Sequence, residues 1–390
     1  MKWNLRHLRV FLAITRHCSV SRAAQECNLS QPAATQAIAK LERDLAQSLF
    51  RHMSQGLFPT PAGEMLAARV ARALRRIDRA AAPISPRLAG AASFAQLEAL
   101  IALRETENFT LAARRLGLSQ PTVHRAVAYL ESEARRPLFD RTAQGIRASR
   151  PARQLADAAR LAFAELEQGE MELAELAGRA AGRIVVGAMP LARSSLLPRA
   201  IAAFRAARPD TLIRVDEGPY ADLLAGLRRG EIDFLIGALR DPLPIGDVVQ
   251  QELFEDDLIP VVGPDHPLRD RPDLTLEDLA AQPWVLARQG TPSRRIFDGL
   301  FQGHRPPESI VETGSMILMR EMLRASDHVG FISRLQAAAE IDLGLMVPLP
   351  LDLPGTRRPI GLTTRQDWLP TAAQDAFLRE LSVSVRQKSY

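Results

Sequence analysis

The feature that most constrains this chain is an internal repeat. Residues 8–56 align with residues 97–145 without a gap, and 16 of the 49 aligned positions are identical. The identities gather in short runs, above all Ala-Ala at 23–24 and 112–113, Leu-Ser-Gln-Pro at 29–32 and 118–121, and Leu-Glu at 41–42 and 130–131. Two copies are too few for a solenoid, whose repeats stack into one continuous core. The repeat therefore predicts a small domain that occurs twice.

Each copy is predicted to contain three helices followed by a β-hairpin. Ser21 and Thr110 belong to residue types that cap helix N-termini, so we expect each to cap a short helix that begins with the paired alanines. That helix should end at Asn28 or Gly117, because both residue types tolerate a left-handed backbone. In the next segment Ser30 or Ser119 should cap a second helix, Pro32 or Pro121 should lie in its first turn, and Leu29 or Leu118 should enter the core.

The second of these helices has the same apolar face in both copies but a different outward face. The apolar stripe is Ala34, Ala37, Ile38 and Leu41 in the first copy and Val123, Ala126, Val127 and Leu130 in the second. The outward face carries Ala33, Thr35, Gln36 and Lys40, against Thr122, His124, Arg125 and Tyr129. A shared core with a changed surface is typical of a helix-turn-helix, whose second helix reads bases in the DNA major groove.

The hairpin that follows has a turn-forming glycine in each copy, and we interpret it as a wing that contacts phosphates. A plain pair of surface helices is the alternative, but it would not explain the capped turn, the wing, the duplication and the basic charge together. The candidate DNA-binding residues are Ser30, Gln31, Pro32, Thr35, Gln36, Lys40 and Arg51 in the first copy, and Ser119, Gln120, Pro121, Thr122, His124, Arg125 and Arg141 in the second.

The charge of the chain is unevenly distributed. Residues 1–153 contain 24 Lys and Arg against 11 Asp and Glu, a net charge of +13, whereas residues 154–390 contain 26 against 34, a net charge of −8. A basic first part joined to an acidic remainder is typical of a protein whose first part binds a polyanion.

The first copy, "AAQECNLSQPAATQAIAKLE", then "LFRH" and "TPAGEML", resembles the LysR-type transcriptional regulators, and the resemblance covers essentially the whole chain. It departs from the family at His52, where the family usually has Arg, and at His124, where it has Ser or Thr. Family members usually carry one winged helix-turn-helix, so the tandem pair is the main departure. In the family, a linker helix after the wing packs antiparallel against the linker helix of a partner chain.

The resemblance and the repeat together imply a multidomain chain. Two α-rich winged helix-turn-helix domains with long linker helices would precede an α/β effector domain of two lobes, like a periplasmic binding protein. The expected boundaries are 1–60 and 93–150 for the winged domains, 61–82 and 151–180 for the linker helices, 83–92 for a Pro/Gly/Ser hinge, and 181–387 for the effector domain. Because both linkers lie in one chain, we expect the two copies to form an intrachain pseudo-dimer.

From Arg183 onward the sequence pattern changes to short β-rich runs separated by helical segments, which predicts parallel α/β units. The expected strands are "RIVVGAM", "TLIRVDEG", "DFLIGAL", "DLIPVVG", "WVLAR", "SIVETG" and "VGFIS". We place the first lobe at 182–262 and 345–385, and the second at 263–344. In the family the chain crosses twice between such lobes.

Ligands of α/β sheets bind beyond the carboxyl ends of strands, often at helix N-termini. Three segments fit that description, "MPLARSS" (189–195), "GTPSRR" (290–295) and "GSMI" (314–317). Hydroxyls, backbone N–H groups and arginines there would suit a carboxylate-bearing effector, although ordinary caps and solvated arginines are the alternative. The candidate effector-binding residues are Pro190, Leu191, Arg193, Ser194, Thr291, Ser293, Arg294, Ser315 and Met316.

Other classes of protein find less support in the sequence. It lacks the G-x-S-x-G, H-E-x-x-H, Walker A and G-x-G-x-x-G motifs, so no enzyme, cofactor or metal site is expected. Cys18 and Cys27 lie nine apart and suit two free thiols in a reducing cytoplasm. No run of 18 apolar residues occurs, and Arg6, Arg9 and Arg16 interrupt the N-terminal apolar stretch, so we expect a cytoplasmic protein without a membrane span.

The sequence thus predicts a LysR-type DNA-binding regulator in which effector binding changes the arrangement of lobes and subunits. Its expected partners are double-stranded DNA, a small-molecule effector, further copies of the chain as a dimer or tetramer, and possible contact with RNA polymerase. Two alternatives stay open: a small-molecule sensor whose helix-turn-helix copies bind proteins, and an enzyme built on a solute-binding fold. Salt-dependent binding to DNA would separate the first alternative from the regulator.

Overall fold

The computed structural model describes residues 3–142, 145–179, 182–243 and 245–386, and the chain divides into two compact units, Met1–Gly182 and Arg183–Tyr390. Within the described residues, no helix combines the length and the apolar character that a membrane crossing requires. Residues 143 and 144 of the second predicted hairpin turn lie outside the described residues.

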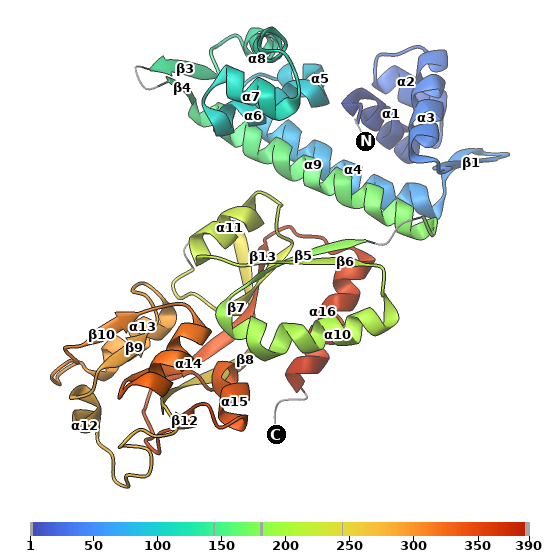
Figure 1. The fold of residues 1–390 in the computed structure, drawn as a ribbon. Helices are drawn as coiled ribbons and strands as arrows, with labels where there is room; N and C mark the ends of the chain where they lie inside the picture. Colours follow the sequence, from blue (N-terminus) through green and yellow to red (C-terminus); the bar gives the residue numbers. More distant parts are fainter. Residues whose placement is uncertain (1–2, 143–144, 180–181, 244, 387–390) are drawn as a thin grey trace. The chain divides into compact units, whose positions relative to one another are not determined.

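The first unit contains the same succession of elements twice (Figure 1). Its first copy is α1 (Leu5–His17), α2 (Val20–Glu26), α3 (Gln31–Leu45), β1 (Phe50–Met53), β2 (Gly56–Pro59) and the long α4 (Pro61–Ala81). After the short α5 (Leu88–Ala91), its second copy is α6 (Phe94–Thr106), α7 (Phe109–Leu116), α8 (Gln120–Ala134), β3 (Phe139–Thr142), β4 (Gly145–Ala148) and the long α9 (Arg150–Leu176). We call α1–β2 the first head and α6–β4 the second head.

The start of the short helix differs from the prediction in both heads. Ser19 caps α2 and Asn108 caps α7, so each helix begins before the paired alanines. Ser21 is therefore inside α2, where its hydroxyl donates to the side chain of Gln31 at 3.0 Å, and Thr110 makes the counterpart bond to Gln120 at 3.5 Å. These hydroxyls join the two helices of the turn instead of capping the first.

Two further predictions about the turn are wrong. Leu29 and Leu118 do not enter the core, since they are 39% and 42% exposed. The core of the first head is filled instead by α1, which buries Leu8 and Phe11 against the apolar stripe of α3. Ser30 caps α3 as predicted, whereas the Ser119 hydroxyl pairs with that of Thr122 at 2.8 Å and makes no cap bond.

The Leu-Glu pair that both copies share connects the second helix of each turn, α3 or α8, which we call the recognition helix, to the hairpin that follows. Glu42 accepts hydrogen bonds from two backbone N–H groups at the start of the hairpin, those of Leu49 at 2.7 Å and Phe50 at 3.1 Å. In the second head Glu131 accepts the counterpart pair at 2.8 and 3.3 Å. A carboxylate in this position satisfies two N–H groups that would otherwise lose their partners on folding, which explains why both copies contain it.

The two long helices α4 and α9 lie side by side (Figure 1). They are antiparallel, because Arg69 contacts Glu172 while Arg76, further along α4, approaches Glu165, further back along α9. Leu66, Val70 and Ile77 of α4 share one buried cluster with residues of α9. The apolar face of each linker helix is thus covered by the other linker helix of the same chain.

The second unit is a mixed sheet covered by helices. Its strands are β5 (Arg183–Ala188), β6 (Leu212–Asp216), β7 (Phe234–Ala238), β8 (Val248–Val262), β9 (Trp284–Leu286), β10 (Ile310–Glu312), β11 (Val329–Ser333), β12 (Val347–Pro348) and β13 (Arg357–Arg365). Their order is β10-β9-β11-β8-β13-β7-β5-β6, with β12 paired to β8. The helices are the π-helical turn η1 (Ala192–Leu196), α10 (Leu197–Ala207), α11 (Tyr220–Arg228), α12 (Leu276–Ala280), α13 (Pro292–Leu300), α14 (Met316–Ala325), α15 (Arg334–Asp342) and α16 (Ala372–Arg386).

Two long strands join the two halves of this sheet. β5, β6 and β7 are parallel in one half and β9, β10 and β11 in the other, as the α/β pattern predicts, but β8 and β13 run antiparallel between them. Residues 248–257 of β8 pair with β13, whereas residues 258–261 pair with β11. Leu258 and Val262 lie in a core with Leu349 and Leu353, so the change from one half to the other falls inside β8.

Candidate DNA-reading surface and effector site

The outward face of each recognition helix is exposed in the way base reading requires. Gln36 on α3 and Arg125 on α8 are counterparts in the repeat, and both are exposed. Among the residues that the structure describes, neither side chain is held by a hydrogen bond or ion pair. A glutamine can pair bidentately with adenine and an arginine with guanine, so the two heads present different chemistry at the same position.

Other predicted reading residues already have partners within the protein. The Thr35 hydroxyl donates to the carbonyl of Gln31 at 3.0 Å, Lys40 lies 3.3 Å from Asp44, and the His124 ring packs on Phe109 with a centroid distance of 5.2 Å. All three predicted side chains are exposed, so they reach the outer surface of the heads. Their contacts fix the direction in which each side chain points.

The remaining predicted DNA contacts fall at helix starts and on the hairpins. Pro32 and Pro121 are exposed in the first turns of α3 and α8, as predicted. Arg51 is exposed on β1, where a wing can reach phosphate. Arg141 lies in β3, and its side chain is outside the described residues.

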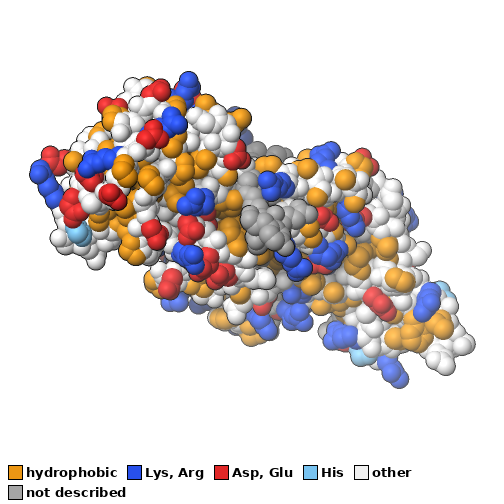
Figure 2. Space-filling model, turned by 90° about the horizontal axis from the view of Figure 1, so that it is seen from below, with side chains coloured by type: hydrophobic (Ala, Val, Ile, Leu, Met, Phe, Trp, Pro, Cys, Tyr) orange, Lys and Arg blue, Asp and Glu red, His pale blue; other side chains and the backbone are white. Residues whose placement is uncertain are grey.

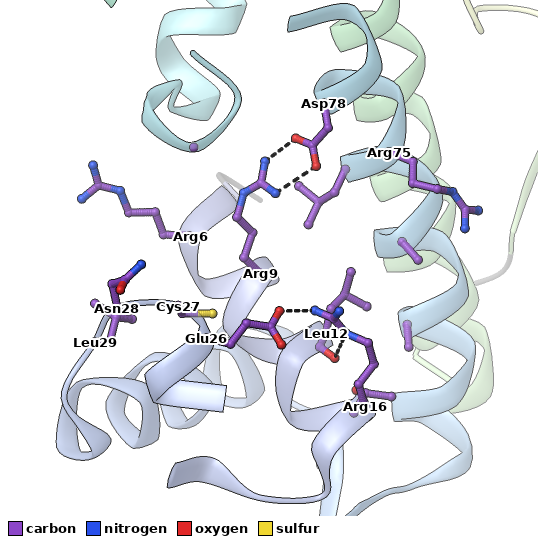
Figure 3. A pocket seen from close by; sticks show the side chains of 15 residues that line it. Arg6, Arg9, Leu12, Arg16, Glu26, Cys27, Asn28, Leu29, Arg75 and Asp78 are labelled. Carbon is purple, nitrogen blue, oxygen red and sulfur yellow. Dashed lines mark hydrogen bonds and ion pairs between the residues drawn. The ribbon is translucent and has the colours of Figure 1, made fainter. Parts of the chain in front are cut away.

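A groove of about 980 Å³ lies between the first head, α4 and the segment that leads to α6. Figure 3 shows Arg9 of α1 reaching Asp78 of α4 through two hydrogen bonds, and Arg16 reaching Glu26 on α2. Arg9 also donates to the carbonyl of Ala89 at 3.0 Å. The second head contacts its linker helix through a different ion pair, in which Arg104 of α6 lies 2.9 Å from Asp157 of α9. Each head is therefore joined to its own linker helix by ion pairs.

A buried cluster of charges joins α4 to α9. Arg69 is 1% exposed, and its guanidinium donates to Glu172 at 2.9 Å and to Glu165 and Gln168 at 3.1 Å. Burial lowers the pKa of Arg69, but the hydrogen bonds and charges of Glu172 and Glu165 outweigh it and raise that pKa above its ordinary value. Sequence patterns did not reveal this cluster, because acidic and basic residues on a long helix usually indicate a solvated face.

In the second unit the predicted arginines are neutralised by neighbours. Arg193 pairs with Glu217, and Arg294 pairs with Asp298 at 2.7 Å and with Glu312. Each of these guanidinium groups, which are predicted to hold a ligand carboxylate, therefore already has a carboxylate partner within the protein.

The predicted hydroxyls have local structural roles. Thr291 caps α13 and Ser315 caps α14, while the Ser194 hydroxyl donates to the carbonyl of Leu191 at 3.0 Å. The Leu191 side chain, predicted to line the effector site, is 3% exposed and so offers little surface to a ligand. Ser293 differs from the other hydroxyls, because it contacts a central strand by accepting from Arg358 of β13 at 2.6 Å.

The structure instead gathers three other arginines where the two halves of the sheet meet. Arg240 follows β7, its guanidinium lies 4.3 Å from the ring centre of Tyr220, and it donates to the carbonyl of Gly290 at 3.4 Å. Burial lowers the pKa of Arg240, and the positive charges of Arg295 and Arg358 lower it further against the effect of Tyr220. The Arg240 Nε and the Tyr220 hydroxyl are buried without a hydrogen-bond partner among the described residues.

Beside these arginines a buried ion pair connects the two central strands β8 and β13, and its carboxylate also contacts β11 in the second half of the sheet. Asp256 of β8 is 5% exposed and accepts from Arg358 at 3.3 and 3.4 Å. Its other oxygen accepts from the hydroxyl of Ser333 at 2.9 Å, at the end of β11. Burial raises the pKa of Asp256, and the charge of Arg358 opposes the rise. Arg358 is thus balanced by Asp256, whereas neither Arg240 nor Arg295 forms an ion pair with a carboxylate among the described residues.

The distribution of surface charge does not mark either site by itself. Figure 2 shows one face of the molecule, on which basic and acidic side chains are interspersed with apolar ones. Within the described part of the chain, no group of three or more His, Cys, Asp or Glu residues is placed to hold a metal ion. A helical helix-turn-helix region joined to an α/β unit is the architecture of a DNA-binding regulator that responds to a small molecule.

Comparison with known proteins identifies the family. Residues 177–384 match the LysR substrate binding domain, and residues 5–64 and 94–153 each match the bacterial regulatory helix-turn-helix protein, lysR family. The HTH-type transcriptional regulator GalR of Pseudomonas putida is 35% identical over 385 residues, with 96% of each chain covered. The chain belongs to the LysR family, as a LysR-type transcriptional regulator with a substrate-binding domain for its effector.

Solved structures show the same fold. A full-length OxyR variant from Pseudomonas aeruginosa gives a TM-score of 0.53 at 24% identity, covering 76% of this chain and 95% of that chain. Full-length CbnR complexed with its target DNA gives a TM-score of 0.52 at 19% identity, covering 75% of this chain and 99% of that chain. GalR and CbnR are transcriptional regulators and not enzymes, and CbnR has been solved in complex with its target DNA.

Proposed function

We propose that one chain presents two DNA-reading heads, held at a fixed spacing by the pairing of α4 with α9. The observation that carries the proposal is that counterpart positions of α3 and α8 are both exposed and carry different base-reading groups, Gln36 and Arg125. In this proposal the heads span 1–60 and 93–150, the linkers 61–82 and 151–180, and the hinge 83–92. The operator would then contain two unlike half-sites, one for each head.

Single substitutions in each recognition helix test this proposal. Gln36→Ala and Arg125→Ala should each weaken binding to the DNA upstream of the gene by about 1–3 kcal/mol, because each removes one bidentate base contact. In a footprint, each variant should lose protection at a different half-site. Arg199→Ala, at an exposed position of α10, is the control and should bind like the unchanged chain. If both variants weakened the same half-site, or if Arg125→Ala changed nothing, the second head would not read DNA.

The effector is proposed to be a small anion, first of all a carboxylate, bound between the two halves of the second unit, residues 181–387. Arg240 and the Tyr220 hydroxyl would contact it, because both have buried polar atoms without a partner among the described residues. Thr291, Ser293, Pro190 and Met316 would form the adjoining walls. The two halves would act as lobes that close on the ligand. The chain would pass from one lobe to the other inside β8 and again just before β13, and not at residues 262 and 345.

Closure of the lobes would change the arrangement of subunits and thereby the DNA contacts. Assembly into a homo-oligomer and contact with RNA polymerase belong to the same proposal. The likeness to CbnR complexed with its target DNA supports the DNA partner, since the folds agree.

Removal of the Arg240 charge should weaken the binding of carboxylates. Arg240→Gln keeps hydrogen-bonding capacity but removes the charge, so the thermal stabilisation that small aliphatic and aromatic carboxylates give the unchanged chain should be lost, a decrease in affinity of about tenfold or more. Amides of the same compounds should stabilise neither protein. Arg294→Gln is the matched control, because its guanidinium is engaged by Asp298 and Glu312. Equal stabilisation of Arg240→Gln and the unchanged chain would contradict an anion site at Arg240.

A further inference from the structure

The contact between α4 and α9 rests on charges of opposite sign that are segregated between the helices. In this cluster the cations are on α4 and the carboxylates on α9. Arg69 is bracketed by Glu165 and Glu172, Arg72 donates to Glu165 at 3.0 Å, and Arg76 lies 3.9 Å from the same oxygen. The Arg69 and Glu165 side chains are 2% and 8% exposed, so their charges are screened little by solvent.

The repeat shows what each helix would meet if it paired with its own copy. The shift of 89 positions that relates the two heads continues into the linkers, since Leu66 and Leu155 are both fully buried, as are Ile77 and Leu166. Residues 150–170 of α9 therefore have counterparts at residues 61–81, which form α4. The counterparts of Arg69, Arg72 and Glu165 are Ala158, Leu161 and Arg76.

Pairing of α4 with the α4 of a second copy, in the same geometry, would bring together charges of like sign. Arg69 and Arg72 would face Arg76 of the second copy, and the reverse contact would repeat the repulsion. Pairing of α9 with a second α9 would place Glu165 opposite Glu165, with Ala158 and Leu161 as its other neighbours. Buried charges without a partner of opposite sign strongly disfavour a contact, and such repulsion specifies partners.

We propose that these buried charges make each linker helix reject its own copy and accept the other linker, so that the DNA-reading pair assembles within one chain. The linker arrangement implied by resemblance to the family is different, since there a linker pairs with the identical linker of a partner chain. The biological consequence rests on the proposed function, because two heads per chain matter only if both read DNA. The pairing itself can be measured without DNA.

Charge exchange in the full chain tests the proposal. One variant carries Arg69→Glu, Arg72→Glu and Arg76→Glu, a second carries Glu165→Arg and Glu172→Arg, and a third combines all five. Each of the first two should show a lower melting temperature and a loss of DNA binding of about 100-fold or more, since buried charges lose their partners. The third should regain both properties, because the charges again complement one another within one chain. Arg79→Glu, exposed on α4, should change neither property.

Each outcome of this experiment decides a separate point. If the combined variant stayed as weak as the first two, pairing of α4 with α9 would be wrong. If recovery required concentrations at which the protein dimerises, measured by light scattering, the two helices would come from different chains and the intrachain part would fail. Recovery of the melting temperature with a footprint of one half-site per chain would refute the two-headed function and leave the pairing intact. Two protected half-sites per chain without recovery of the melting temperature would refute the pairing and leave the two-headed function intact.

Discussion

Replacing Asp256 with alanine is expected to lower the free energy of unfolding of the second unit by about 3–5 kcal/mol. The substitution would leave the Arg358 guanidinium, which is 8% exposed, buried without its carboxylate. It would also remove the acceptor of the Ser333 hydroxyl at the end of β11. Urea unfolding followed by tryptophan fluorescence would measure the loss, since Trp284 and Trp368 both lie in this unit.

The neighbouring residue provides the matched control. Asp257 carries the same side chain one position along β8 and pairs with Arg357 at 3.3 Å, but the two side chains are 42% and 72% exposed. Asp257→Ala should therefore change the free energy of unfolding by no more than about 1 kcal/mol. Equal effects of the two substitutions would mean that Arg358 finds another partner or reaches water, and that the ion pair does not hold the halves together.

Deleting residues 1–92 should reduce operator binding by about 10²–10⁴-fold. The deletion removes one head and α4, so the remaining head would bind a half-site without the gain that a linked second head gives. It also uncovers the apolar face of α9 and leaves Glu165 and Glu172 without Arg69. Titration of labelled operator DNA with the truncated and full-length proteins at one salt concentration would measure the change.

A second comparison separates the loss of reading from the loss of folding. A full-length chain with Thr35→Ala and Gln36→Ala keeps α4 and its contacts but lacks the reading groups of the first head. It should lose sequence preference at one half-site while its circular dichroism and melting temperature stay unchanged. A truncated protein that bound as tightly as the full chain would show that the second head acts alone.

Much of the first unit follows from the sequence because its pattern is local. Helical periodicity and the proline near each start predicted linker helices from Pro61 and Pro151, and the structure has helices at Pro61–Ala81 and Arg150–Leu176. The positions of Leu29 and Leu118 were mispredicted, since an apolar residue beside a turn can lie on either side of it. In the first head α1 packs against α3 and fills the core, so that Leu29 lies at the surface.

The second unit was harder to predict where contacts join distant segments. Charged residues such as Arg358 and Asp256 interrupt β13 and the part of β8 that pairs with it, so these segments have a weaker apolar pattern. These charges are tolerated because they neutralise each other across 102 positions of sequence. The carboxylate partners of Arg193 and Arg294 could not be read from the sequence either, because Glu217 and Glu312 lie 24 and 18 positions away.

The most direct test of the account is the number of half-sites that one chain protects. A footprint of the purified protein on its upstream DNA, combined with the mass of the complex in solution, gives the ratio of chains to half-sites. The account predicts two protected half-sites of different sequence for each chain bound, and therefore four for a dimer. One half-site per chain, with the pattern unchanged by Arg125→Ala, would contradict it.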